Sequence, residues 1–197
     1  MSASEIPTGM EESLPAATRI LHATIHLLVE RGATRLSLQD VADAAGVSKG
    51  LIHYHYHDKD TLLTRAVEWM AAEITRRERE ALANATPRSA VDDIWRWLDG
   101  ELRLGHVRAL LELAQEPSDL VREAVHAAAL ARRAEEARTL QRLFTLLNLR
   151  GRLPPQLVAE VSVAFVDGLV IEAGMVPEQD PRVAFDVFWL GMLSLTE

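Results

Sequence analysis

Hydrophobic residues recur at every third or fourth position along almost the whole chain, and few stretches alternate between β-branched and polar residues. This spacing is typical of helices that bury one face, so the sequence predicts an all-α fold of about nine helices. Glycine, proline and capping residues mark the turns between them. The expected helices cover residues 20–31, 37–46, 48–56, 59–86, 89–102, 107–114, 118–148, 155–173 and 181–195.

The second and third expected helices carry clear boundary signals. Ser37 is followed three residues later by Asp40, which resembles a capping box, and Gly46 ends the second helix. Ser48 can cap the third helix. Because only a short turn separates the two helices, they must cross steeply and pack through small side chains. Residues 37–56 are therefore predicted to form a helix-turn-helix.

The last two expected helices are apolar on more than one face. Hydrophobic side chains almost surround the helix at 155–173, a pattern that the surface of a monomer would not tolerate. The sequence favours a homodimer held by a four-helix interface, with an intramolecular core as the alternative. Ala164 and Gly168 are four residues apart and would let another backbone come close. The residues predicted at this interface are Val161, Ala164, Phe165, Gly168, Phe188, Trp189 and Met192.

These patterns divide the chain into three segments. Residues 1–14 have neither a basic start nor an apolar core, so they are predicted to be a disordered arm rather than a targeting signal. Residues 15–60 are expected to form the helix-turn-helix domain, and residues 61–197 a larger helical body that carries the regulatory and dimerisation functions. No apolar run approaches the roughly 18 residues that a membrane span needs. The absence of cysteine excludes disulfides and thiolate metal sites, and a cytoplasmic location is the default expectation.

The net charge of −8 argues against a protein that binds nucleic acid through bulk positive charge. The chain has only two lysines, and both lie within residues 37–62. Any binding to DNA must therefore depend on local geometry. Residues 15–60 are neutral overall, with the five cations Arg19, Arg31, Arg35, Lys49 and Lys59 and the five anions Glu30, Asp40, Asp43, Asp58 and Asp60.

A helix that enters the major groove of DNA needs small residues in its first turn, so that its backbone can approach the base edges. Ser48, Lys49 and Gly50 meet this need, and Lys49 can donate to guanine. Free amides at the starts of both short helices attract phosphate. Taken singly, each of these residues could be only a cap, a core residue or a solvated charge. The side chains expected to reach the DNA backbone are Ser37, His53, Tyr54, His55 and Lys59.

The region from 19 to 70 resembles the DNA-binding domain of the TetR family of bacterial regulators. The family pattern S/T-x-x-D-I-A-x-x-A-G-V-S-x-G corresponds to SLQDVADAAGVSKG at residues 37–50. An aromatic-rich turn follows at 54–56, and then a lysine-acid pair at 59–60. The resemblance implies a dimeric, all-helical, ligand-responsive regulator of transcription.

By position, the resemblance implies that Gln39, Lys49 and Leu51 face bases, and that the five backbone-facing side chains named above face phosphates. Leu51 stands where threonine is frequent, which removes a donor and favours contact with a thymine methyl group. His53 stands where tyrosine is usual and Tyr56 where phenylalanine is usual, and neither change threatens the fold. The implied partner is a double-stranded, palindromic operator whose half-sites lie about one helical turn or a multiple apart.

In the larger body, the resemblance implies a site for a small-molecule effector among the middle helices. Few polar groups converge there in the sequence, so an apolar or amphipathic effector is favoured. Each candidate residue also has the simpler interpretation of a core or surface position. The candidates are Trp69, Trp97, His106, Glu112, His126 and Phe144.

No metal or cofactor is expected. His22 and His26 have the i,i+4 spacing of a metal pair, but no third ligand lies near them in the sequence, so we interpret both as residues of a solvated helix face. His53 and His57 also share a helical face, but they stand where phosphate would pass.

Two other classes of protein compete with a DNA-binding regulator. An enzyme is disfavoured because the sequence has no nucleophile elbow, P-loop, dinucleotide fingerprint or zinc-protease motif, and its acidic pairs are adjacent rather than one helical turn apart. A helical dimer that acts through protein partners, with a relic helix-turn-helix, is the second alternative. The sequence favours a homodimeric repressor that an effector releases from its operator.

Overall fold

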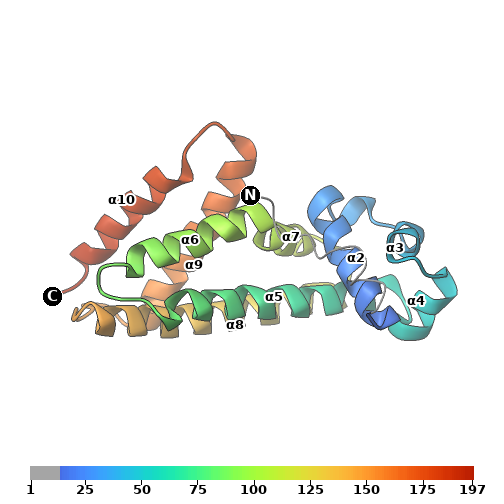
Figure 1. Ribbon diagram of the computed structural model, residues 1–197, viewed down its shortest axis with the longest axis horizontal. Helices are drawn as coiled ribbons and strands as arrows, with labels where there is room; N and C mark the ends of the chain where they lie inside the picture. Colours follow the sequence, from blue (N-terminus) through green and yellow to red (C-terminus); the bar gives the residue numbers. More distant parts are fainter. Residues whose placement is uncertain (1–13) are drawn as a thin grey trace. The chain divides into compact units, whose positions relative to one another are not determined.

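The computed structural model describes residues 14–197, and residues 1–13 of the predicted arm lie outside the described residues. This part of the chain folds into nine α-helices and one short 3₁₀-helix, which confirms the predicted all-α fold (Figure 1). Within residues 14–197 the only strand-like pairing is an isolated bridge between Gly151 and Thr196. The elements are α2 (Ala16–Arg31), η1 (Ala33–Arg35), α3 (Leu38–Ala45), α4 (Lys49–Tyr56), α5 (Lys59–Ala83), α6 (Ala90–Leu104), α7 (His106–Leu113), α8 (Asp119–Leu146), α9 (Pro155–Met175) and α10 (Pro181–Ser194).

The helices form two compact units. The first unit contains residues 14–70 and 103–128, and the second contains residues 71–102 and 129–197. Helices α5 and α8 are each continuous through both units. The predicted domain boundary at residue 60 falls at the start of α5, whose first half belongs to the first unit.

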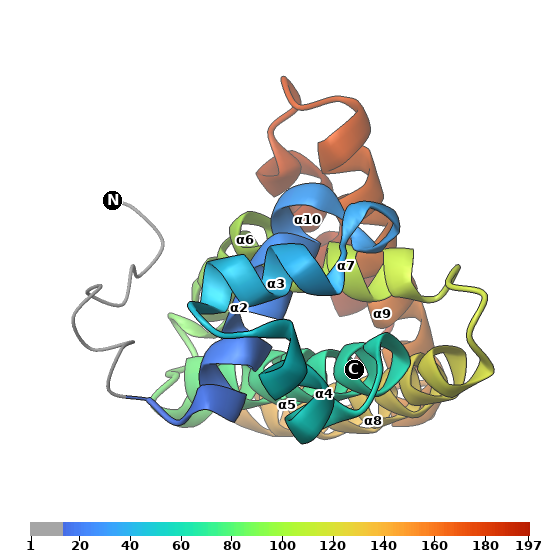
Figure 2. The same ribbon diagram turned by 90° about the vertical axis from the view of Figure 1, so that its right-hand side faces the viewer.

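In the first unit, α2 packs against α3 and α4 (Figure 2). The buried face of α2 is the one that the sequence predicts, with Ile20, Thr24 and Leu28 inside. The Thr24 hydroxyl donates to the carbonyl of Ile20 at 2.8 Å, so this buried polar group is satisfied. The Tyr56 hydroxyl donates to the carbonyl of Ala17 at 2.7 Å and so ties the end of α4 to the start of α2.

The short helix η1, which the sequence did not predict, follows α2. Gly32 separates the two helices with a φ of 75°, in the left-handed region that favours glycine. Helix η1 and α2 both pack against α7, and Arg108 of α7 donates to the carbonyl of Val29 at 2.5 Å. Helix α7 therefore supports the C-terminal end of α2 within the first unit.

The second unit packs α6, α9 and α10 around the adjoining halves of α5 and α8. Figure 1 shows α5 and α8 running alongside each other. No helix in residues 14–197 has the length and hydrophobicity needed to cross a membrane. The fully packed core of this unit contains Ala90, Leu98, Leu140, Leu143, Val158, Ala159, Leu169, Phe185, Trp189 and Met192.

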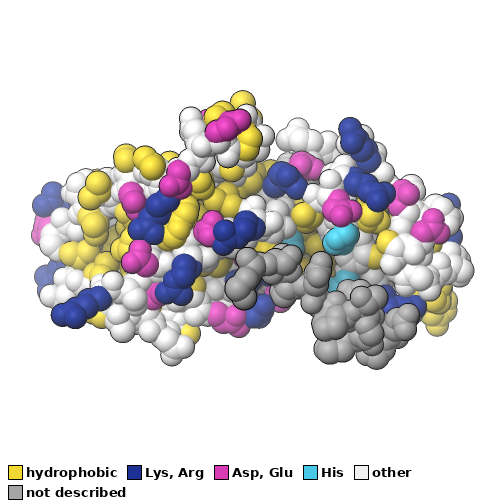
Figure 3. All heavy atoms as spheres, turned by 45° about the horizontal axis from the view of Figure 1, so that its top comes forward, with side chains coloured by type: hydrophobic (Ala, Val, Ile, Leu, Met, Phe, Trp, Pro, Cys, Tyr) yellow, Lys and Arg dark blue, Asp and Glu magenta, His cyan; other side chains and the backbone are white. Residues whose placement is uncertain are grey.

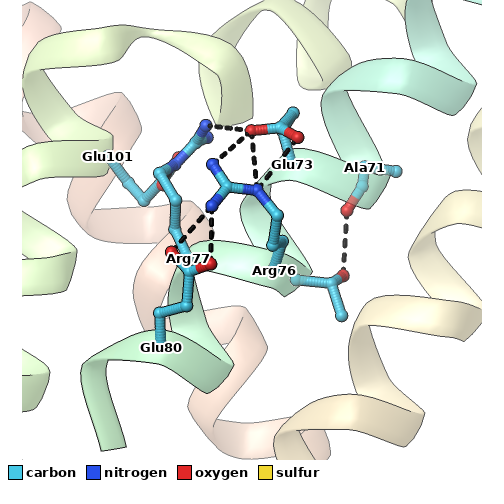
Figure 4. Close-up of polar contacts among 7 residues, drawn as sticks. Ala71, Glu73, Arg76, Arg77, Glu80 and Glu101 are labelled. Atoms are coloured by element: carbon cyan, nitrogen blue, oxygen red, sulfur yellow. Dashed lines mark hydrogen bonds and ion pairs between the residues drawn. The ribbon is translucent and has the colours of Figure 1, made fainter. Parts of the chain in front are cut away.

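A buried glutamate of α6 anchors α5. Glu101 is 1% exposed and accepts two hydrogen bonds from Arg77, at 2.5 and 3.1 Å. Figure 4 shows that Arg77 and Arg76 both approach the carboxylate of Glu73 on the same helix. A buried carboxylate is tolerated only when it is paired, so this contact fixes the rotation of α5 relative to α6.

A second buried glutamate joins α5 to α8. Glu135 has no exposed surface and accepts from both nitrogens of the Arg79 fork, at 2.8 and 2.7 Å. Arg138, one turn along α8, donates to the same carboxylate at 2.5 Å. The hydrogen bonds from Arg79 are the main reason that the pKa of Glu135 falls to about 2. This carboxyl group therefore stays ionised at every physiological pH.

Candidate nucleic-acid interface and effector cavity

Helix caps set the geometry of the turn between α3 and α4. The Ser37 hydroxyl oxygen accepts from the amide of Asp40 at 3.2 Å, and Asp40 accepts in return from the amide of Ser37 at 3.1 Å. Gly46 ends α3 with a φ of 62°. The Ser48 hydroxyl oxygen accepts from the amide of Leu51 at 3.3 Å and so caps α4. These contacts confirm the predicted helix-turn-helix.

The first turn of α4 is open to solvent. Ser48, Lys49 and Gly50 are all exposed, and the first amides of a helix have no partners within it. If Gly50 carried a Cβ, the nearest described atom would be the Ser48 hydroxyl oxygen, at 3.9 Å. The chain's own packing therefore does not require glycine here. The first turn of α4 leaves room for close approach by an external partner.

Two predicted contact residues near the start of α3 already have partners. The Ser37 hydroxyl donates to Asp40 at 2.5 Å, and this bond is the main cause that lowers the pKa of Asp40 below its ordinary value. The Gln39 amide donates to Asp43 at 2.8 Å. Because the single hydroxyl proton of Ser37 is in use, its side chain can accept from a partner but cannot donate to a phosphate without losing Asp40. The amides of the helix start are better phosphate ligands at this point.

The far end of α4 carries three exposed side chains of the predicted contact set. Nδ1 of His53 lies 2.7 Å from the carbonyl oxygen of His57, and since a carbonyl only accepts, the proton is on Nδ1. Tyr54 is 77% exposed, and its ring lies 5.1 Å from that of His55, which is also exposed. No core packing explains an exposed tyrosine of this kind. Leu51, predicted to face bases, is half-buried.

Lys59 has a structural partner within the first unit. Its ammonium group donates to the carbonyl of Ala33 in η1 at 3.3 Å. Because an ammonium group has three donors, this bond leaves two of them for solvent or for a phosphate. The sequence could not show this contact, because it did not predict η1.

Four of the six predicted pocket residues belong to the first unit: Trp69, His106, Glu112 and His126. Trp69 packs against His106, with ring centroids 5.8 Å apart, and against His22, at 5.7 Å. His22 is therefore not on a solvated face as we had interpreted it, whereas His26 is exposed. Glu112 and His126 are both exposed. These residues do not converge on one cavity.

A cavity lies inside the second unit, between α5, α6, α8, α9 and α10. The cavity measures about 30 Å³, which is room for about two water molecules, so the lining side chains stand close together and would have to move apart to admit a ligand. Trp97 is the predicted pocket residue that lines it, and Phe144 is not among the lining residues. The aromatic lining consists of Trp97, Phe165, Phe185, Phe188 and Trp189.

Two carboxyl groups that were not predicted as site residues line this cavity. Glu78 of α5 is 6% exposed, and Glu136 of α8 lines the same space. Burial, and next the charge of Glu136, raise the pKa of Glu78 to about 8. Glu136 is partly exposed as a residue, but burial of its carboxyl group raises its pKa as well. The cavity is therefore less purely apolar than the sequence indicates.

Several residues predicted at a dimer interface lie inside the single chain instead. The rings of Phe165 and Phe188 stack with centroids 4.1 Å apart and line the cavity. Trp189 and Met192 are 5% and 3% exposed and belong to the core. Helical spacing could not distinguish these positions from outward ones, because α9 and α10 are apolar on both faces. The members of the predicted set that are exposed are Val161, Ala164 and Gly168.

Replacing Glu78 by Gln is expected to stabilise the protein at neutral and alkaline pH. A carboxyl group whose pKa is raised in the folded state contributes stability that is fully present below its unfolded pKa and is lost as the pH rises. Between pH 4.5, the ordinary pKa of a glutamate, and about pH 8, the raised pKa of Glu78, the wild type therefore loses stability that Glu78→Gln keeps. At pH 8 the variant should be more stable by about 1–3 kcal/mol, and at pH 4.5 the difference should shrink towards zero.

Urea unfolding at both pH values measures this difference. Glu80→Gln is the matched control, because Glu80 is an exposed carboxylate on the same helix. A stability difference for Glu78→Gln that is equal at both pH values would contradict the assignment.

Comparison with known proteins supports the interpretation of the first unit. Residues 20–66 match the family profile described as "Bacterial regulatory proteins, tetR family". The HTH-type transcriptional regulator CymR of Pseudomonas putida is 33% identical over 84 residues, which are 43% of this chain and 41% of that protein. The HTH-type transcriptional repressor Rv3405c of Mycobacterium tuberculosis is 35% identical over 72 residues, or 36% and 37% of the two chains. The chain thus spans less than half the length of these relatives.

Comparison with solved structures extends the similarity to the whole fold. The crystal structure of the reduced form of Escherichia coli NemR has a TM-score of 0.76 at 18% identity, covering 91% of this chain and 98% of that one. At this identity the likeness concerns the fold alone. The predicted family resemblance of residues 19–70 is confirmed by the profile match.

Proposed function

We propose that this chain, which belongs to the TetR family of bacterial regulatory proteins, is a cytoplasmic transcriptional repressor that an effector releases from DNA. The observation that carries the proposal is the first turn of α4. Ser48, Lys49 and Gly50 are exposed, small or basic, and fixed by the caps of α3 and α4. A helix start of this kind fits the major groove. The relative Rv3405c is named a repressor, and this supports repression rather than activation.

Base recognition in this proposal depends on α4. Lys49 donates to O6 or N7 of guanine, and Leu51 contacts a thymine methyl group. Gln39 of α3 reaches a neighbouring base when it leaves Asp43. The amides at the starts of both helices hold phosphates, together with Tyr54 and His55. With a chain charge of −8, these local contacts supply the affinity.

A homodimer would present two such helices to a palindromic operator. Helix α10 is apolar on its outer side as well as its inner side, with Val187 and Leu190 65% and 69% exposed. Figure 3 shows hydrophobic side chains gathered on the face that carries α10. Exposed apolar side chains in this number favour an interaction site. We define the patch on α9 and α10 by its exposed large hydrophobic residues, which are Leu157, Val161, Ile171, Met175, Val183, Val187, Leu190 and Leu193.

The cavity of the second unit is the proposed effector site. Helices α5 and α8 line it and also continue into the first unit. A ligand that separates the stacked rings of Phe165 and Phe188 would displace the helices around them. Such a displacement can pass along α5 and α8 because a helix moves as a rigid element. Release from DNA then follows if the displaced arrangement has a lower affinity for the operator.

Selection of bound DNA from a random pool tests the proposed function. The wild type should enrich a palindrome with half-sites one helical turn or a multiple apart. Lys49→Ala should weaken binding to that palindrome by about 1–3 kcal/mol and relax the preference at one base pair of each half-site. If no sequence is enriched, the chain acts through protein partners and carries a relic helix-turn-helix.

A further inference from the structure

The polar groups of the cavity in the second unit have an unusual composition. Its lining contains two carboxyl groups, Glu78 and Glu136, and within the described residues no arginine, lysine or histidine lines it. Thr139 and Ser162 are the other polar side chains, apart from the indole groups. The rest of the lining is aliphatic or aromatic. An anionic ligand would be repelled by such a site.

The two carboxyl groups also lack a buried counter-ion. Among the described residues, neither of them forms an ion pair with an arginine. The arginines whose charges act on this pair have other partners. Arg132 donates to Asp167 at 3.0 Å, and Arg79 donates to Glu135. An unpaired carboxylate in an apolar interior is costly, so a group that could pair with it would be bound favourably.

Unsatisfied polar atoms concentrate at the same place. In residues 14–197, six buried side-chain nitrogen or oxygen atoms have no hydrogen-bond partner, and four of them belong to residues that line this cavity. Folded proteins satisfy nearly all such atoms, so their gathering around one cavity points to a partner inside it. The indole groups only donate and need water or an acceptor, whereas the free oxygen of Glu78 can face a cation. Hydrogen bonds with Thr139 and Glu136 also act on the pKa of Glu78. The four are Glu78 Oε1, Thr139 Oγ1, Trp97 Nε1 and Trp189 Nε1.

The aromatic residues of the cavity also favour a cationic ligand. Five aromatic side chains line the cavity, and the face of an aromatic ring attracts a cation more strongly when water is excluded. A neutral apolar ligand would use the rings but leave Glu78 unpaired. A strongly hydrated metal ion would gain little from the rings. An organic cation with an apolar body satisfies both parts of the lining.

We propose that the cavity binds a monovalent organic cation, an ammonium group attached to an apolar or aromatic body, with Glu78 and Glu136 as its counter-ion. The proposal rests on the proposed function for the role of the cavity as an effector site. The cation lies between the carboxyl groups and the aromatic rings, and its apolar body separates Phe165 from Phe188. The two carboxyl groups share one proton, so that the pair carries the single negative charge that a monovalent cation needs.

Calorimetric titration of the full chain with phenyltrimethylammonium tests this proposal, with tert-butylbenzene as the neutral compound of the same shape. The wild type should bind the cation saturably and more tightly than the neutral compound. Glu78→Gln and Glu136→Gln should each lower the affinity for the cation by at least about tenfold and leave the affinity for the neutral compound unchanged. Glu80→Gln is the matched control, since its carboxylate is exposed. The proposal is overturned if the wild type does not bind the cation saturably, or if the variants lose affinity for both compounds equally.

The pH dependence of wild-type binding provides a second measurement that needs no variant. Burial raises the pKa of both carboxyl groups, so the free pair holds more protons than the singly charged pair that the cation needs. Binding therefore displaces a proton, and the affinity for the cation should rise by up to about tenfold per unit from pH 6 to 8. The other charged groups that act on this pair are Glu135, Arg79 and Arg132, and the first two are locked in their own ion pair. Because the probe is a permanent cation, its own charge does not change. An affinity that is flat over this range overturns the proposal.

A third measurement separates the cation site from the proposed function. Phenyltrimethylammonium should release the selected palindrome from the wild type and not from Glu78→Gln. If the cation binds with the expected dependence on Glu78 but leaves the DNA complex intact, the site is confirmed and the effector role of the cavity fails. If tert-butylbenzene releases DNA from both proteins and the cation does not, the effector role stands and the cation proposal fails.

Discussion

Gly50→Ala is expected to abolish most of the sequence-specific binding to DNA while leaving the protein folded. Within the chain, the added methyl group would meet nothing closer than the Ser48 hydroxyl oxygen at 3.9 Å. Because alanine favours helix more than glycine does, the free energy of unfolding should stay equal or rise by less than about 1 kcal/mol. At the groove, however, the methyl group occupies space where the backbone must approach the base edges. Affinity for the selected palindrome should fall by about 10- to 100-fold.

The matched control for this prediction is Gly100→Ala. Gly100 lies within α6, and an added Cβ there would meet no described atom within 4 Å. Its substitution makes the same chemical change in a helix far along the sequence, and it should leave operator affinity unchanged. Thermal unfolding and a DNA mobility shift, performed on both variants, measure the two effects separately. Full operator affinity in Gly50→Ala would mean that the first turn of α4 does not enter the groove.

Local signals in the sequence were sufficient for the helices and for the helix-turn-helix. The capping pair of Ser37 and Asp40, the glycine at 46 and the cap at Ser48 each act over three or four residues, and each forms as predicted. The same kind of local signal did not predict the short helix η1. Residues 33–35 form η1 without periodicity or a capping pattern, so the partner of Lys59 could not be foreseen.

The cavity of the second unit could not be predicted because its lining comes from five helices. Glu78 and Glu136 are 58 positions apart, and no spacing rule connects them. Glu135 and Glu136 are neighbours in the sequence, and adjacent carboxylates do not share one face of a helix. Neighbours on a helix point about 100° apart. Glu135 therefore turns towards Arg79, and Glu136 towards the cavity.

The sequence also could not show which faces of the apolar C-terminal helices are buried. Periodicity identified α9 and α10 as apolar on both faces but could not assign a face to the core or to a partner. The structure places Phe188 and Trp189 inside, with Val187 and Leu190 outside, although these four residues are consecutive in the sequence. The dimer interface is accordingly proposed at the exposed residues of α9 and α10, and these are the positions to mutate.

Leu190→Glu is expected to convert the protein into a folded monomer that has lost most of its affinity for the operator. Leu190 is 69% exposed in the single chain, so a charged side chain there meets water and leaves the core intact. In a dimer it would be buried opposite its own copy, and two carboxylates without partners would repel each other. Because a dimer binds the second half-site intramolecularly, its loss should lower operator affinity by at least about 100-fold.

Sedimentation velocity and a mobility shift on the palindrome measure both effects, and circular dichroism checks that the helices persist. Leu130→Glu is the matched control, because Leu130 is a leucine of α8 that is 51% exposed and lies outside the patch on α9 and α10. It should remain dimeric and bind the operator as the wild type does. Since the introduced charge is the same, only its position distinguishes the two variants. Dissociation of Leu130→Glu together with an intact Leu190→Glu dimer would place the interface on α8 rather than α10.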